Sequence, residues 1–219
     1  MLILQPNHHT YHFPKICGVN CLSVSECRKL PMVWLSQTWA GRGNTPPRTG
    51  AALAALDEAL LVFMETEETE LRAEVTMQGG NVCEDSCMEF FATFDCEAGP
   101  GYLNFEINPI GTLHLAYGTE MQNRVMVEKP SHKKFFEINT GITPKGWFVR
   151  YLIPYRFIKE YFPSFNDIEN NIEKTQMAGN FYKCGNLTKY PHYGSWNPIL
   201  SEKGSFHRPE YFGRLICKN

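Results

Sequence analysis

Amides and carboxylates that could bind a polar ligand recur at alternate positions of one segment. Tyr102–Asn108 (Y-L-N-F-E-I-N) alternates strictly, so Asn104, Glu106 and Asn108 share one face, and the leucine, phenylalanine and isoleucine between them share the other. Each sugar hydroxyl both donates and accepts hydrogen bonds, and amides and carboxylates can satisfy it. We therefore expect these three side chains to bind a sugar. The alternative is an ordinary solvated outer face.

Glu89 is the carboxylate of a second segment, 87–94, where its neighbours are aromatic. A carboxylate in such surroundings must be paired, hydrogen-bonded or shifted in pKa. It could accept hydrogen bonds from a ligand or form an ion pair with Arg150 or Arg124, and we place Glu89 and Arg150 in the predicted ligand-binding set. Glu89 and Glu106 also permit another chemistry, because two carboxyl groups about 5 to 9 Å apart can hydrolyse glycosides.

The C-terminal third alternates aromatic residues with glycine, proline and polar residues, at 179–185, 192–198 and 206–213. Loops of this composition are common places for rings that stack on ligands. We add Trp196, Phe206 and His207 to the predicted ligand-binding set. The alternative for Trp196 and Phe206 is that they cover the core.

The eight cysteines are expected to be mostly free thiols. The chain shows no export signal and is long enough to fold without disulfide staples. The cysteines at 17, 21, 27, 83, 87 and 96 fit neither paired C-x2-C zinc knuckles nor redox motifs. We therefore predict no metal site and no catalytic residue of the Cys–His type.

Composition bounds the class of protein. The chain has 219 residues, 43% of them hydrophobic and 20% charged, which is typical of a globular protein that folds as one domain, residues 1–219. The net charge of -2 leaves no basic excess for nucleic acid or an anionic membrane. No signal peptide and no apolar run of about 20 residues is visible, so we expect a soluble, cytoplasmic protein.

Short runs rich in valine, isoleucine, phenylalanine and tyrosine predict an all-β fold, a two-sheet antiparallel β-sandwich. The expected strands are 60–65, 87–94, 102–108, 112–117, 135–139 and 147–154, with a hairpin turn at Asn108-Pro-Ile-Gly111. One short helix is expected at Tyr155–Phe162, before Pro163. Residues 1–33 should form an irregular lead that wraps the sandwich, with an edge strand near 33–36 and a Gly/Pro-rich loop at 41–50.

Five motifs together resemble carbohydrate-binding module family 9-like domains, from about Trp34 to the end of the chain. They are D-S-C-M-E-F-F at 85–91, Y-L-N-F-E-I-N-P-I-G at 102–111, W-F-V-R-Y-L-I-P at 147–154, G-N-F-Y-K-C-G at 179–185 and F-H-R-P-E-Y-F-G at 206–213. The resemblance implies a DOMON-like β-sandwich, similar to modules attached to xylanases, which bind the ends of sugar chains between two tryptophans. It also implies calcium, for which no acidic cluster such as D-x-D-x-D-G is present.

The chain departs from this family pattern at the ligand site. Cys83 and Phe206 stand where the resemblance places the two tryptophans, and Glu106 stands where those modules carry an arginine. Glu89 matches the acidic residue of the family motif. The resemblance therefore carries the fold over more firmly than the ligand.

Three functions remain open. The first is non-catalytic binding of a mono- or oligosaccharide. The second is a glycoside-processing enzyme that uses Glu89 and Glu106. The third is a structural or interaction module whose sugar groove has decayed, which a lead covering Asn104 and Glu106 would favour. The sequence does not reveal the oligomeric state.

Overall fold

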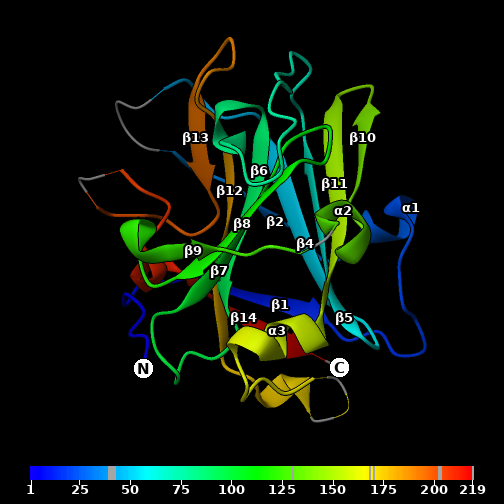
Figure 1. The fold of residues 1–219 in the computed structure, drawn as a ribbon, viewed down its shortest axis with the longest axis vertical. Coiled ribbons are helices and arrows are strands. Elements are labelled where there is room, and N and C mark those ends of the chain that lie inside the picture. The colour runs from blue at the N-terminus through cyan, green and yellow to red at the C-terminus, as the bar shows by residue number, and fades with distance from the viewer. Residues whose placement is uncertain (39–42, 130, 168, 170, 202–203, 219) are drawn as a thin grey trace.

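Two β-sheets pack face to face in the computed structural model, which describes the chain except residues 39–42, 130, 168, 170, 202–203 and 219 (Figure 1). The strands are β1 Thr10–Pro14, β2 Val33–Trp34, β3 Gln37–Thr38, β4 Thr49–Ala55, β5 Ala59–Thr66, β6 Cys87–Thr93, β7 Tyr102–Ile107, β8 Leu113–Gly118, β9 Arg124–Met126, β10 Asn139–Thr143, β11 Gly146–Pro154, β12 Met177–Gly185, β13 His192–Ser195 and β14 Gly213–Lys218. The helices are α1 Val24–Cys27, α2 His132–Phe135 and α3 Tyr155–Tyr161, with 3-10 turns at Val82–Glu84, Met121–Asn123, Ile172–Lys174 and Pro209–Tyr211.

Among the described residues, the larger sheet has the order β1-β14-β12-β6-β7-β8-β9, and β13 and β3 extend it beside β12. The smaller sheet has the order β10-β11-β5-β4-β2. The ladders are antiparallel except that of β1 with β14, which is parallel. The predicted fold class, a two-sheet β-sandwich, is confirmed.

The core lies between the sheets because strands present alternate residues to it. In β7 the inward residues are Leu103, Phe105 and Ile107, all fully buried, as the alternation predicts. The hairpin from β7 to β8 is confirmed: Gly111 has φ +82° and donates its N–H to the Asn108 carbonyl at 3.0 Å. The predicted helix is α3, which lies across the lower end of the sandwich in Figure 1 and buries Phe157 and Ile158.

The lead is less irregular than predicted, because the whole of β1 pairs with residues 214–218 of β14. It does cover the smaller sheet: Leu22 and Cys27 pack with Ala54, Leu61 and Phe63 on the outer face of that sheet. Helix α1 begins in a capping box formed by Ser23 and Glu26, which satisfies free N–H groups at its start. The predicted edge strand is β2, which pairs with β4.

The predicted strand at 135–139 is wrong. Residues His132–Phe135 form α2, and the strand begins only at Asn139. The two phenylalanines at 135 and 136 gave a strand-like pattern. In the structure their rings pack edge to face with centroids 4.8 Å apart, and both rings contact Phe157 of α3.

Strand β4 was not predicted, because its sequence T-G-A-A-L-A-A has weak strand propensity. It is buried on both faces, where small side chains fit between the core and the lead. Of the predicted loop at 41–50, residues 41 and 42 lie outside the described residues. Across the described part of the chain, no helix combines the length and the apolar character needed to cross a bilayer.

Candidate functional site

A pocket of about 420 Å³ lies on the outer face of the larger sheet, over β6, β7, β8 and β12. We call it the face pocket. The strand register aligns Tyr182, Glu89, Glu106 and His114 in one row across these four strands. The side chains of such a row point to the same side of the sheet, and the last three line the pocket. The remaining described lining residues are Asn81, Cys83, Met121, Arg124, Cys184, Asn186, Tyr193, Gly204, Ser205, Phe206 and His207.

Two carboxyl groups form the floor of the face pocket. Glu89 and Glu106 are directly opposite on β6 and β7, and their residues are only 2% and 6% exposed. Burial, and then repulsion from Glu106, raise the pKa of Glu89 well above its usual range. Burial also raises the pKa of Glu106, although His114 and Arg124 act against this rise. The pair thus favours holding a proton, and its oxygens face a cavity.

Arg124, at the start of β9, supplies positive charge at the edge of the face pocket. Its Nη1 lies 3.6 Å from Glu106 Oε1, an ion-pair distance that is too long for a hydrogen bond. Nη1 is buried and has no hydrogen-bond partner among the described residues, and the same holds for Asn186 Oδ1. A buried donor and a buried acceptor without partners cost stability unless a ligand or water satisfies them. The face pocket therefore offers free hydrogen-bonding groups of both kinds.

Aromatic rings from the C-terminal third of the chain form one wall of the face pocket. The Phe206 ring stacks on Tyr182 with centroids 4.1 Å apart, and Tyr193 meets Phe206 edge on at 6.4 Å. His207 stacks on Phe91 at 4.9 Å. Burial, helped by the charge of Arg124, lowers the pKa of His207 to about 3. The imidazole is therefore neutral at physiological pH.

The structure brings four of the predicted residues together in the face pocket: Glu89, Glu106, Phe206 and His207. Asn104 shares their side of the sheet, but it is fully buried and donates to Glu106 Oε1 at 2.8 Å. It supports the floor carboxylate instead of lining the cavity. Its own Oδ1 has no hydrogen-bond partner among the described residues.

Three other predicted residues lie elsewhere, and their placement in the site is corrected. Asn108 is fully buried, donates to Val75 O and Asp85, and thereby holds a loop. Arg150 belongs to β11 of the smaller sheet, where it donates to Cys21 and to Leu22 O. Neither sequence distance nor motif could show that it sits on the opposite sheet from Glu89.

Trp196 is also misplaced by the prediction. It is 5% exposed and packs in the main core against Tyr11 and Phe181, at 6.2 and 5.9 Å. The loop that carries it turns the indole inward, and Phe206 from the next loop faces the cavity. The core-covering alternative holds for Trp196.

The predicted ligand-binding set left out several lining residues: His114, Cys184, Asn186, Tyr193 and Arg124, which the sequence suggested only as an ion-pair partner of Glu89. His114 had a signal, because it alternates with the apolar residues of β8. Its Nδ1 donates to the Gly79 carbonyl at 3.0 Å, which fixes the ring over the row. Arg124, Asn186 and Tyr193 come from separate elements and had no local pattern.

The N-terminal residues and the segment before β14 cover part of the same face. Leu2, Ile199 and Phe212 pack with Phe91 and Tyr102 in a buried cluster. This cover reaches the part of the face around Asn104, whereas Glu89 and Glu106 remain in the face pocket. These segments therefore cover part of the sheet but leave the face pocket open.

Metal-ligating atoms cluster at one place within the described residues. Cys87, Glu89 and Cys184 each offer one ligand atom, and these atoms lie within 4.8 Å of one another. Calcium prefers six to eight oxygen ligands, so two sulfur atoms do not fit it. The calcium implied by the family resemblance therefore has no place in this cluster.

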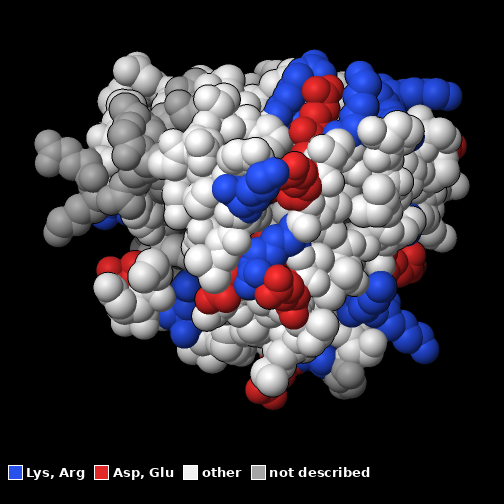
Figure 2. Space-filling model, turned by 90° about the horizontal axis from the view of Figure 1, so that it is seen from above, with Lys and Arg blue, Asp and Glu red and all other residues white. Residues whose placement is uncertain are grey.

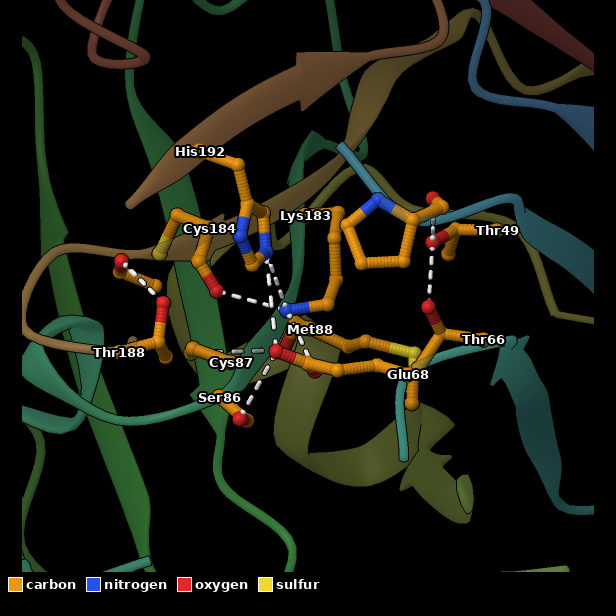
Figure 3. Close-up of polar contacts among 12 residues, drawn as sticks. Thr49, Thr66, Glu68, Ser86, Cys87, Met88, Lys183, Cys184, Thr188 and His192 are labelled. Carbon is orange, nitrogen blue, oxygen red and sulfur yellow. Dashed lines mark hydrogen bonds and ion pairs between the residues drawn. The ribbon is translucent and has the colours of Figure 1, made fainter. Parts of the chain in front are cut away.

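A second polar cluster surrounds Lys183 on the inner side of β12, the side that its register partner Met88 shares in the core (Figure 3). Lys183 is fully buried and forms an ion pair with Glu68 Oε2 at 3.0 Å. Its Nζ also donates to His192 Nε2 at 2.9 Å, and Ser86 donates to Glu68 at 3.0 Å. Burial and the Lys183 charge lower the pKa of His192 to about 4. The polar groups of this cluster form hydrogen bonds and ion pairs with one another, so we interpret the cluster as structural.

Charges of both signs are interspersed on the surface. Figure 2 shows the upper end of the sandwich, where Lys and Arg side chains lie beside Asp and Glu side chains across the centre of the view. This face therefore lacks the continuous positive patch that favours binding of nucleic acid.

A two-sheet sandwich that carries a polar pocket with an aromatic wall on the outer face of one sheet is typical of a β-sandwich ligand-binding module. The chain belongs to carbohydrate-binding family 9, whose family model matches residues 36–217. The resemblance seen in the sequence is thereby confirmed.

Several solved structures share the fold of this chain. A proposed carbohydrate-binding protein from Bacteroides uniformis superimposes with a TM-score of 0.80 at 23% identity, over 97% of this chain and 100% of that one. A family 9 module from Caldicellulosiruptor kristjanssonii in complex with cellotriose gives 0.64 at 14% identity, over 95% and 93% of the two chains. The same organism's module in complex with glucose gives 0.63 at 13%, over 95% of both. No curated protein matches the chain.

Proposed function

We propose that the chain binds a mono- or oligosaccharide non-catalytically in the face pocket. The observation that carries the proposal is the set of buried, unsatisfied hydrogen-bonding atoms around a cavity floored by carboxyl groups. Arg124 Nη1 can donate and Asn186 Oδ1 can accept, and Glu89 and Glu106 add further acceptors. Adjacent sugar hydroxyls need this mixture of donors and acceptors.

The walls suit a sugar as well. The apolar C–H face of a pyranose packs on an aromatic ring, and the ring available here is Phe206, held in place by its stack on Tyr182. Cys83, which packs against the same small hydrophobic cluster as Phe206, adds a small apolar surface to the lining. Membership of family 9 and the cellotriose and glucose complexes of its structural neighbours support glucose-type ligands.

Isothermal titration with glucose, xylose, cellobiose and longer cello-oligosaccharides tests the proposal. Glu89→Gln should weaken binding up to about tenfold, because it removes an acceptor oxygen from the pocket floor and a hydrogen bond contributes about 0.5–1.5 kcal/mol. Phe206→Ala should also weaken binding. Trp34→Ala is the matched control, since Trp34 is a 44% exposed ring on the edge of the other sheet. Silence across the panel, or loss of binding in the control alone, contradicts the proposal.

Glycoside hydrolysis is a second candidate, favoured by one observation: Glu89 and Glu106 are neighbours across two strands and both have raised pKa values. A hydrolase needs one protonated and one ionised carboxyl group. Turnover of chromogenic glycosides that is lost in Glu106→Gln would favour the enzyme. Binding without turnover favours the module.

A further inference from the structure

Three metal-ligating side chains meet at the floor of the face pocket, and we call them the thiol cluster: Cys87, Glu89 and Cys184. Cys87 and Glu89 are two positions apart on β6, so they point to the same side of the sheet. Cys184 on β12 is directly opposite Cys87 in the strand register. Cys184 Sγ lies 2.8 Å from Glu89 Oε1.

The thiol cluster is buried, and the contacts of Glu89 compensate poorly for the burial of its carboxyl group. The three residues are at most 2% exposed, and within the described part of the chain no Lys or Arg nitrogen lies within ion-pair distance of Glu89. The carboxyl group is instead contacted by a thiol, a weak hydrogen-bond donor. A bound cation would compensate a buried carboxylate far better.

The donor set selects the kind of metal. Two thiolates and one carboxylate are ligands of zinc, at bond lengths of about 2.3 Å to sulfur and about 2.0–2.2 Å to oxygen. For a tetrahedral ion these lengths place ligand atoms about 3.5–3.8 Å apart. The ligand atoms of the thiol cluster all lie within 4.8 Å of one another, so small side-chain movements suffice.

The surroundings complete the site. Glu89 and Cys184 line the face pocket, so a fourth coordination position opens into the cavity. Two thiolates and a carboxylate around a divalent ion leave one net negative charge. Arg124 lines the same pocket, and its positive charge would offset part of it.

We propose that Cys87, Glu89 and Cys184 bind a zinc-type divalent cation with three protein ligands and one open position facing the pocket. Zinc binds the thiolate form of cysteine, so metal binding displaces protons from the thiols and strengthens as pH rises. The proposal goes beyond sugar binding and does not depend on it.

The test uses the full chain, stripped of metal and kept reduced without oxygen. Cobalt(II) is titrated first, because thiolate ligands give it a near-ultraviolet charge-transfer absorption and tetrahedral coordination strengthens its visible bands. One equivalent should bind, and zinc should displace it in competition with a chromophoric chelator. The apparent zinc affinity should rise with pH.

Three variants and a control identify the ligands. Cys87→Ser, Cys184→Ser and Glu89→Gln should each weaken zinc binding roughly a hundredfold or more, beyond the effect of losing an outer partner. Cys217→Ser is the matched control, because Cys217 is equally buried but lies on β14. Glu89→Gln keeps both thiols, so it still reports if a serine variant fails to fold.

Absence of the cobalt thiolate absorption in the folded, reduced chain overturns the proposal. So does absorption that survives in both serine variants, or that is lost in Cys217→Ser alone. Metal uptake is read without sugar, so its failure leaves the sugar titration valid, and failure of the sugar titration leaves the metal result valid.

Discussion

The neutral, buried state of His207 gives a prediction that can be worked in numbers. Its pKa is lowered from 6.5 in the unfolded chain to about 3 in the folded one. Between these values the unfolded chain binds a proton that the folded protein does not, so stability falls as pH falls. From pH 6.5 to pH 4 the loss is about 2.5 units at 1.36 kcal/mol each, or about 3 kcal/mol.

The perturbation is His207→Asn, which keeps an acceptor near the place of Nδ1, 2.9 Å from the Tyr102 hydroxyl. Asparagine does not titrate, so the variant loses this term at all pH values. The difference in unfolding free energy between wild type and variant should therefore shrink by about 3 kcal/mol between pH 7 and pH 4. Urea denaturation at the two pH values measures it.

Tyr102→Phe is the control, because it removes the hydroxyl contact and leaves the titrating ring. Its cost should be nearly the same at pH 7 and pH 4. An equal cost of His207→Asn at both pH values would refute the reasoning, since the imidazole would then accept a proton in the folded state as easily as in the unfolded one.

Three further predictions concern the pocket floor, the inner cluster and the core. In metal-free protein, Glu89→Gln should stabilise the fold by about 1 kcal/mol or more at pH 7, because the folded-state pKa of Glu89 is raised and burying the ionised carboxylate costs free energy. The gain should vanish near pH 4, where glutamate is protonated in the unfolded chain too. Thermal unfolding at the two pH values measures it. Lys183→Met should cost about 3–5 kcal/mol in urea denaturation by leaving Glu68 buried and unpaired, and adding Glu68→Gln should restore part of it. Trp196→Ala should cost about 3–5 kcal/mol of stability, yet the folded variant should bind sugar as the wild type does.

The strand that carries Asn104 and Glu106 shows how far sequence alone reaches. The alternation of Tyr102–Asn108 identified the strand, its core face and the following hairpin correctly. These are local properties, since a strand has a period of two and a turn has its own residue preferences. The same alternation placed Asn108 with its neighbours on the polar side, but it could not show that the amide is used by the loop at Val75.

Other parts of the site were outside the reach of local pattern. Arg124 and Asn186 enter the pocket from elements far apart in the chain, and Cys184 meets Cys87 only through the register of β12 on β6. Arg150 looked like a partner for Glu89, although the two lie in different sheets. Pairing between distant segments is decided by the packing of the whole core, which no short window of sequence contains.

The sequence by itself determined the β-sandwich class, the positions of its best-patterned strands and the family. Only the tertiary structure decided which of the aromatic residues face the cavity and which fill the core. The physical reason is that burial stabilises any aromatic ring in proportion to the area removed from water, so the residue type alone does not say which ring is buried. The sheet register and the neighbouring loops select between these two positions, and they turned Trp196 inward and Phe206 toward the pocket.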